Sequence, residues 1–304
     1  MPFTSKHKAY IALAATSIIW GTTWVAMKFG LKGLPPLELA SIRQFIAGGI
    51  FVVFFLLKKE PLPNWQTFKK LFFLAILTFV LANALSTWSL KYISSGLGAL
   101  IGALYPLSVV IMEYFFFKNK SINALTVIGI LLGIGGIVFV FYDNAFGVHP
   151  QGYFFGLILA IIAMLSWSLS SILIARKYIQ MNPYFGMGWQ MLISSIVVGI
   201  WSLSNEQTVN ILDISFNSWM AITYLIIAGS MIAIIAFIYS LKHLNPAIAV
   251  LYAYINPLIA MVTGSILLGE KLTMVILIGS TITLVGVFLV NYSMKKIREK
   301  EIIE

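Results

Sequence analysis

The sequence predicts an all-α integral membrane protein with ten transmembrane helices, arranged as two inverted five-helix repeats. Three observations lead to this prediction. The 304-residue chain is strongly apolar, with a mean hydropathy of +0.95. Apolar runs of about twenty residues recur along it, which is the length that a helix needs to cross the hydrocarbon core. The second half of the chain also repeats the first, and each half contains five of these runs.

Composition narrows the class of protein. Hydrophobic residues make up 60% of the chain and charged residues 10%, so a soluble fold of this length would lack the polar groups to cover its surface. The apolar runs show no ten-residue alternation of the kind that builds a membrane barrel. Cysteine is absent, which excludes disulfides and thiolate chemistry. The net charge of +10 is attributed to basic residues at helix ends, as membrane topology requires, and not to a nucleic-acid surface.

The distribution of basic residues predicts the topology. The first span is expected to be a retained helix, because no clear cleavage site follows it. With the N-terminus inside, fifteen Lys and Arg fall on that side, four fall on the other, and Arg43 lies within a span. We therefore expect a multi-pass protein of the cell inner membrane with both termini in the cytoplasm. The expected spans are residues 10–30, 36–57, 70–90, 95–117, 125–142, 152–175, 184–203, 218–240, 246–268 and 273–293.

The internal repeat is clearest between residues 89–119 and 240–270, which align without a gap at a shift of 151 positions. Nearer the N-terminus the shift is 147, which implies a four-residue insertion in the loop after span seven. We expect the first repeat over residues 1–146 and the second over 147–304, with a short cytoplasmic C-terminal tail. Because each repeat has an odd number of spans, the second enters the membrane upside down. The matched pairs include Pro106 with Pro257, Gly135 with Gly286, Trp20 with Trp167, Pro36 with Pro183, and Arg43 with Gln190.

Three short motifs stand out. Span one reads IIWGTTWVAMKFG, with Trp20 and Gly21 near its centre. Span two contains LELASIRQ, which includes Arg43, and span nine ends in LLGEKLT, which includes Glu270. With these motifs the chain resembles the EamA family of the drug/metabolite transporter (DMT) superfamily over nearly its whole length. The first repeat departs from the pattern, because FKNKSI replaces the GEKLT ending and Asn119 stands where the second repeat has glutamate.

The resemblance implies a ten-helix inner-membrane carrier that works by alternating access. Substrates of the family include amino acids and other small metabolites, which are often exported. No Walker motif occurs in the chain, so transport would run on a gradient of substrate or ion. The leading hypothesis is a secondary transporter that exports amino acids or related small metabolites, with aromatic or hydrophobic ones preferred. The alternative is a lipid or drug flippase or exporter of the same fold.

A membrane-embedded enzyme is the least favoured hypothesis. Lipid chemistry generally needs grouped His, Asp or Cys, and the three histidines lie in tails or loops. We expect no catalytic residue, no metal and no cofactor. A channel is disfavoured because neither a filter nor a ring of charges is present. The expected partners are a small-molecule substrate and the lipid bilayer, not nucleic acid, and a monomer is favoured over a dimer.

The substrate site of an inverted-repeat carrier lies at mid-membrane between the repeats. Aromatic residues at that depth are informative, because Trp and Tyr normally stay at the two membrane interfaces. They predict a cavity that stacks on a ring or holds an ammonium group by cation–π attraction. Ordinary helix packing is the alternative, and Ser and Thr can also simply join helices. The candidate substrate-binding residues are Trp20, Thr23, Trp24, Asn83, Tyr105, Ser166, Trp167, Ser170, Tyr254 and Asn256.

Two prolines near mid-span are candidate gating elements. Pro106 and Pro257 each remove a backbone donor, which kinks a helix and frees a carbonyl. The kinks act either as hinges for gating or as static bends, and both interpretations stay open.

Two charged residues lie inside spans. Arg43 is about 10 Å from the outer end of span two by helical rise, and it either attracts an anionic group of the substrate or serves as a structural anchor. Glu113, toward the cytoplasmic end of span four, is the candidate for proton coupling, with an interfacial glutamate as the alternative. No central carboxylate pair occurs, so proton coupling and facilitated diffusion both stay open. Glu270 sits at a helix end and is expected to cap or pair locally.

Small residues predict where helices approach closely. Residues 98 and 102, and residues 129 and 133, are glycine pairs with GxxxG spacing. Packing within the monomer is favoured over dimerisation at these pairs. Gly135 and Gly286 are expected to be packing positions for the last helix of each repeat.

Overall fold

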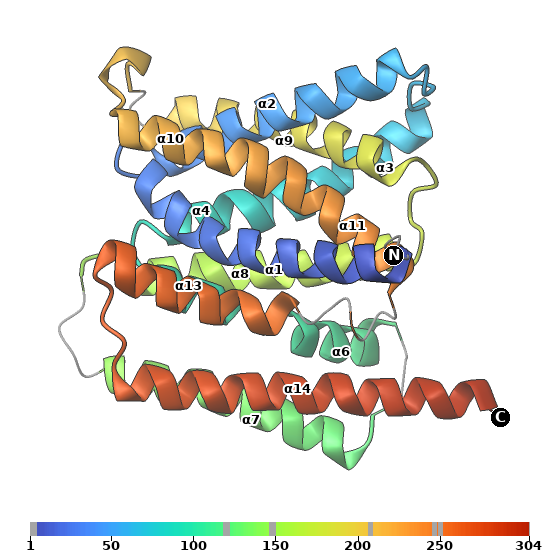
Figure 1. Cartoon of the computed structure of the whole chain (residues 1–304), viewed down its shortest axis with the longest axis vertical. Coiled ribbons are helices and arrows are strands. Elements are labelled where there is room, and N and C mark those ends of the chain that lie inside the picture. The colour runs from blue at the N-terminus through green and yellow to red at the C-terminus, as the bar shows by residue number, and fades with distance from the viewer. Residues whose placement is uncertain are drawn as a thin grey trace.

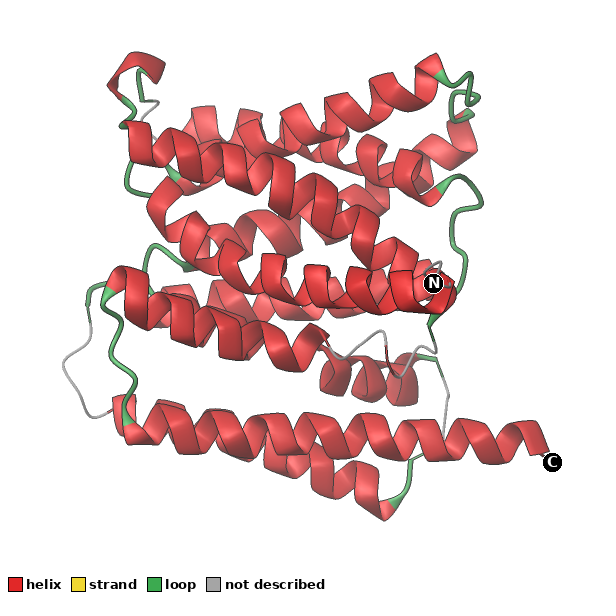
Figure 2. Ribbon diagram, in the orientation of Figure 1, coloured by secondary structure: helices red, strands yellow, loops and turns green. Residues whose placement is uncertain are grey.

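The computed structural model describes residues 5–117, 122–145, 150–205, 209–244, 248 and 252–303. Within these ranges the chain consists of helices joined by loops and contains no strand (Figure 2). Large apolar side chains cover much of the outer surface: Phe115 is 71% exposed, Leu131 66% and Ile266 74%. Such a surface is expected of helices that face lipid and not of a monomeric soluble protein.

The ten expected helical crossings are present in the described part of the chain. Eight helices are long and apolar enough to cross a membrane, and two shorter apolar helices, within α7 and α13, complete the set. The first five crossings are α1 (Ser5–Gly30), α2 (Pro36–Leu57), α3–η1–α4 (Trp65–Ala75, Ile76–Ala84 and Leu85–Ser89), α5–α6 (Ser95–Gly102 and Tyr105–Phe116) and α7 (Ala124–Ala145). The second five are α8 (Tyr153–Ala175), α9 (Pro183–Asn205), α10–η3–α11 (Phe216–Tyr224, Leu225–Ile232 and Ala233–His243), α13 (Tyr252–Leu268) and α14 (Met274–Ile303), with a 3₁₀ turn η2 (Ile211–Asp213) in the loop before α10.

Local sequence explains where several of these helices begin. Proline opens α2, where the missing backbone donor has no cost. The side chain of Asn64 accepts from the Thr67 amide at the start of α3, and Ser94 does the same for Leu97 at the start of α5. These side chains satisfy amides that have no partner within their own helix.

The packing of the helices follows the repeat. Three pairs join equivalent crossings of the two halves: α2 packs on α9, α7 on α14, and α5 on α13. The remaining contacts come in matched sets. Helix α1 packs on α13 and on the α10–η3–α11 crossing, and its counterpart α8 packs on α5–α6 and on the η1–α4 segment. The start of α1 and the end of α14 lie at the same end of the bundle (Figure 1), as expected for an even number of crossings.

The pair α7–α14 forms one side of the bundle (Figure 1) and is held by backbone contact. A Cβ added at Gly286 would meet the Gly129 carbonyl at 2.6 Å and the Gly133 Cα at 2.7 Å. One expectation is wrong: Gly135 has nothing within 4 Å of an added Cβ, and its neighbour Gly136 faces α14 instead. Successive residues of a helix point about 100° apart, so only one glycine of this pair can face the partner helix.

The third and eighth crossings each contain an irregular helical segment near their middle. The segments η1 and η3 both wind as π-helix, with one extra residue per turn. Shifted by 151 positions, η1 corresponds to residues 227–235 and overlaps η3. Wider turns of this kind leave carbonyls open to other partners. The Phe79 carbonyl accepts from the side-chain amide of Gln44 at 3.3 Å, and the Gly229 carbonyl accepts from the Trp20 indole at 3.2 Å.

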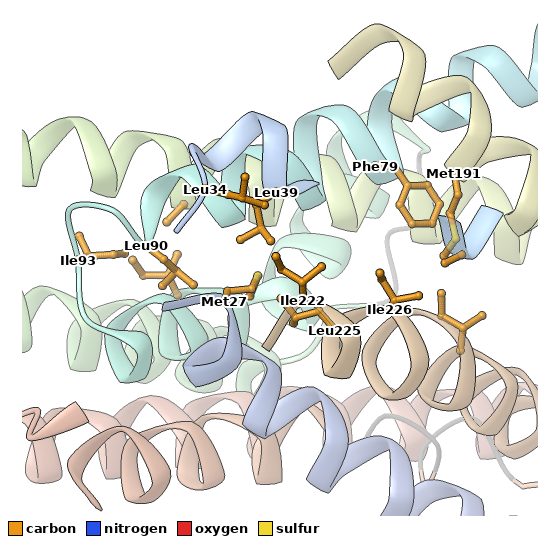
Figure 3. Packing of buried hydrophobic residues seen from close by; sticks show 14 of the residues in the cluster. Met27, Leu34, Leu39, Phe79, Leu90, Ile93, Met191, Ile222, Leu225 and Ile226 are labelled. Atoms are coloured by element: carbon orange, nitrogen blue, oxygen red, sulfur yellow. The ribbon is translucent and has the colours of Figure 1, made fainter. Parts of the chain in front are cut away.

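The main apolar core draws on buried residues of α1, α2, η1, α5, α7, α8, α9, α10, η3, α11 and α13. Figure 3 shows Met27, Leu39 and Ile222 pointing toward one another from α1, α2 and α10, with Phe79 and Met191 at the far end of the cluster. Phe79 and Met191 also line the cavity described below. The core therefore packs directly against one wall of the site.

Candidate functional site

A cavity of about 200 Å³ lies between the two repeats. Its lining comes from α1, α2, η1, α4, α5, α6, α8, α9, η3, α11 and α13, and no described residue of α7 or α14 contributes to it. The pair α7–α14 is thus set apart from the site. This volume is below the 300–1,000 Å³ that is typical of pockets for drug-sized ligands, so the cavity suits a small molecule.

Aromatic rings form one wall of the cavity. The ring of Trp20 lies 6.2 Å from that of Trp167, 5.0 Å from Phe237 and 5.2 Å from Tyr252, measured between centroids. Tyr252 also stacks on Tyr105 at 6.1 Å. The Trp20 indole N–H is already bonded to the Gly229 carbonyl, which fixes the ring. A fixed cluster of rings offers π faces to a cation or to another ring.

Trp24 and Asn256 join α1 to α13 at the cavity. The Trp24 indole donates to the Asn256 Oδ1 at 3.0 Å. Because an indole N–H can only donate, this contact assigns the oxygen of the Asn256 amide to Trp24 and leaves its NH₂ group as a donor. Both residues line the cavity.

The polar part of the lining centres on Arg43 and Asn83 from α2 and η1. The Arg43 side chain is buried, with 5% of its surface exposed. Its Nη2 donates to the Asn83 Oδ1, which also accepts from Gln44 Nε2 at 3.1 Å. The Gln44 Oε1 in turn accepts from the Ser194 hydroxyl on α9. A network of neutral groups thus holds a permanent positive charge at the cavity.

The structure brings together most of the residues that the sequence singled out. Arg43 lies with them, whereas Glu113, Pro106 and Pro257 do not line the cavity. The seven predicted substrate-binding residues that line it are Trp20, Thr23, Trp24, Asn83, Tyr105, Trp167 and Asn256.

Three predicted substrate-binding residues lie outside the lining. Tyr254 donates to the Val287 carbonyl at 3.0 Å and accepts from Asn291, so it fastens α13 to α14. Ser170 donates to the Trp167 carbonyl at 3.0 Å, and Ser166 is buried outside the cavity. Residues 160, 163, 164 and 167 share the cavity face of α8, and the helical repeat places Ser166 and Ser170 beside that face.

The two prolines play different parts. The helix breaks before Pro106, at residues 103 and 104, and Pro106 lies in the first turn of α6. Pro257 instead lies inside the continuous helix α13. The first turn of a helix tolerates proline, because the backbone N–H that proline lacks would have no intrahelical partner there. A helix break just before Pro106 therefore removes the cost of that proline, whereas Pro257 has no such break.

Glu113 lies near the end of α6 and forms an ion pair with Arg176 at 3.6 Å. Arg176 caps α8, is 47% exposed, and stacks over the Phe117 ring at 4.1 Å. Partly exposed pairs of this kind contribute little to stability. The position of Glu113 separates it from the cavity.

The sequence reasoning missed Tyr252, Phe237 and the methionines at 164, 187 and 191, all of which line the cavity. Tyr252 had a usable signal. It lies four residues before Asn256 and therefore on the same helix face, whereas Tyr254 lies two residues away and faces elsewhere. Tyr254 was chosen because it lies near mid-span. The four-residue spacing from Asn256 would have indicated Tyr252 instead.

Comparison with known proteins shows the family to which the chain belongs. The model of the EamA-like transporter family matches residues 7–142 and 154–292. The chain belongs to the EamA-like transporter family. The two matched segments correspond to the two sets of five crossings seen in the structure.

Relatives include proteins named as transporters. The chain is 30% identical over 275 residues to the uncharacterised inner membrane transporter YedA of Escherichia coli (strain K12), covering 90% of this chain and 87% of YedA. It is 20% identical over 290 residues to the uncharacterised transporter YoaV of Bacillus subtilis (strain 168), covering 95% and 98% of the two chains. A solved crystal structure, 17% identical, aligns with a TM-score of 0.66 over 95% of this chain and 98% of that one, which shows a shared fold. This EamA-like protein is accordingly a multi-pass membrane protein of a transporter family.

Proposed function

We propose that this EamA-like protein is a secondary transporter that exports amino acids or related small metabolites across the bacterial inner membrane by alternating access. The observation that carries the proposal is the cavity between the repeats, lined by equivalent residues from both halves. Trp20 and Trp167 form one equivalent pair in the lining, and Tyr105 and Asn256 form another. A site on the axis that relates two inverted repeats can open to either side when the repeats exchange conformations.

The chemistry of the lining supports a small substrate with both apolar and polar parts. The wall of rings suits an ammonium group or an aromatic side chain. The Asn256 amide and the Arg43 guanidinium supply hydrogen-bond donors in the same cavity. An amino acid presents these groups together within a volume that the cavity accommodates.

The proposed orientation rests on charge. The start of α1 and the end of α14 lie at one end of the bundle (Figure 1), and most of the Lys and Arg residues are assigned to that side. Basic residues favour the cytoplasmic side, so we place both termini there. Export then means opening the cavity first at this end and afterwards at the opposite end.

Counterflow in proteoliposomes tests the proposed function. Vesicles that hold the purified protein are loaded with unlabelled amino acids and offered labelled phenylalanine, threonine or glutamine, with and without a pH gradient. Transient accumulation of one label without a pH gradient is expected, and protein-free vesicles should show none. A further gain with the gradient would indicate proton coupling. Absence of counterflow for every label would exclude the amino-acid assignment.

A second apolar hollow favours the alternative, a lipid or drug flippase of the same fold. It lies between α2, α9 and the η3–α11 segment, has a volume of about 490 Å³, and carries almost no polar surface. Its lining residues are Ile50, Phe51, Phe54, Phe55, Tyr184, Met231 and Ile235. In the same vesicles, accelerated loss of a labelled phospholipid to an external quencher, without amino-acid counterflow, would select this alternative.

A further inference from the structure

A buried positive charge lies at the cavity. Arg43 lies seven residues after Pro36 on α2, well inside the span, and lines the cavity with Asn83 and Phe79. Arginine keeps its charge in proteins. An arginine near the centre of a membrane helix is costly to insert. A charge at this depth therefore needs a partner or a function.

Arg43 has no acidic partner among the described residues. The ion pair between Arg176 and Glu113 lies elsewhere in the bundle. The hydrogen bond of Arg43 goes from Nη2 to the neutral Asn83 oxygen, and its buried Nε has no hydrogen-bond partner in the described structure. A buried positive charge without a counter-ion is costly, so the Arg43 guanidinium at the cavity would gain from an anion bound there.

The surrounding network positions the guanidinium without neutralising it. Gln44 donates to the Asn83 oxygen at 3.1 Å and to the Phe79 carbonyl at 3.3 Å, and it is bonded in turn to Ser194. The chain thus holds Arg43 in place with three neutral side chains from α2, η1 and α9. A carboxylate in any of these places would have cancelled the charge.

The equivalent position in the second repeat shows that this feature belongs to one side only. Gln190 occupies it, is 4% exposed, and donates to the Gly186 carbonyl at 3.2 Å. Gln190 does not line the cavity, although its helix neighbours Met187 and Met191 do. The positive charge therefore lies on one side of the axis that relates the repeats, and the cavity is more polar on the side of Arg43 than on the equivalent side of the second repeat.

We infer that Arg43 is the anion subsite of the cavity and that the transported molecule carries a carboxylate, which the guanidinium binds. This deepens the proposed function, since it rests on the same cavity and narrows its substrate class. A single arginine in a cavity of about 200 Å³ suits a monoanionic carboxylate. A phosphate dianion would leave one negative charge uncompensated.

Matched ligands test the subsite directly. The full-length protein in lipid nanodiscs is titrated by calorimetry with 3-phenylpropanoate and with 3-phenylpropanamide, which differ only in the group offered to Arg43. Hydrogen bonds to charged groups are worth about 1.5–3 kcal/mol, so the acid should bind about 10–100-fold more tightly than the amide. Equal affinity for the two ligands, or binding of neither, overturns the assignment without any variant.

Variants separate a binding role from a structural one. In Arg43→Gln the affinity for the acid should fall to that for the amide, while the affinity for the amide stays within about threefold. Arg43→Lys keeps the charge and should retain part of the preference for the acid. Gln190→Met, the matched change in the other repeat, should leave the preference intact. Parallel loss of acid and amide binding in a folded Arg43→Gln protein would show that Arg43 only braces α2 against η1.

Failure of the carboxylate subsite and failure of the amino-acid transport proposal give different results. Preference for 3-phenylpropanoate that depends on Arg43, together with no amino-acid counterflow, keeps the carboxylate subsite and rejects amino acids. Counterflow of phenylalanine, together with equal binding of acid and amide, keeps the transport proposal and rejects the subsite.

Discussion

The rings of Trp20 and Trp167 meet edge to face in the cavity, with centroids 6.2 Å apart and planes at 89°. The two residues hold the same position in the first and second repeat. The axis that relates the repeats therefore passes close to this contact. Any exchange of conformation between the repeats has to change the surroundings of these two rings.

Trp167→Leu should reduce counterflow by about tenfold, because it removes a π face worth about 0.5–2 kcal/mol in cation–π attraction but keeps the position apolar. Trp65→Leu is the control, since Trp65 lies outside the cavity and is 68% exposed. The melting temperature is measured for both variants. Normal counterflow in Trp167→Leu would show that the ring wall does not contact the substrate.

Asn256→Leu should destabilise the protein by about 1–3 kcal/mol, because the Trp24 indole N–H would lose its acceptor at 3.0 Å. The same change made in a Trp24→Phe background should cost less, since no donor is left unpaired. Thermal unfolding of the single and double variants gives the coupling between the two sites. Strictly additive effects would count against the hydrogen bond.

Glu270→Ala should loosen the start of α5. The Glu270 carboxylate accepts from the Ser95 amide and from the Ser95 hydroxyl, each at 2.7 Å, and these bonds cross from the second repeat to the first. Loss of such a cap typically costs about 0.5–2 kcal/mol. Hydrogen exchange over residues 95–102 should speed up, whereas Lys271→Ala, a change at the exposed neighbouring residue, should not alter it. Equal exchange in the two variants would mean that the cap contributes nothing.

Gly136→Ala should destabilise the α7–α14 pair, and Gly135→Ala should not. An added Cβ at Gly136 would meet the Thr283 backbone nitrogen at 2.6 Å, but the same atom at Gly135 meets nothing within 4 Å. Overpacking of this kind typically costs about 1–3 kcal/mol. The two melting temperatures decide the matter, and an equal shift in both variants would refute the contact geometry.

The crossings and the inverted repeat were predictable from the sequence, because hydropathy indicates the first and the internal duplication indicates the second. Apolar runs give the length of each helix, and the ungapped shift that matches Pro106 with Pro257 gives the inverted repeat. The π-helical segments and the break before Tyr105 were not predicted. They depend on contacts between helices, such as the bond from Trp20 to the Gly229 carbonyl.

The sequence indicates which residues lie near the middle of a span, but not which face of the helix each side chain occupies. Seven of the ten candidates near mid-span line the cavity, whereas Tyr254 faces α14 and Tyr252 lines the cavity instead. Glu270 was expected to cap or pair locally, and the structure shows that it caps α5 in the other repeat. A left-handed residue, Gly269 with φ of +67°, ends α13 and turns the chain there, and only the tertiary structure shows which helix the carboxylate then reaches.

Alternating access requires the cavity to open to both sides of the membrane, and the absence of cysteine makes this directly measurable. Ser86→Cys places one thiol in the cavity lining, and Ser204→Cys places one on the exposed last turn of α9 as a control. Proteoliposomes are treated with a membrane-impermeant thiol reagent from the outside or from the lumen, with and without a transported substrate. Labelling of Ser86→Cys from either side, slowed by substrate, is the predicted result, while Ser204→Cys reacts from one side only. Labelling of Ser86→Cys from a single side under every condition would contradict alternating access through this cavity.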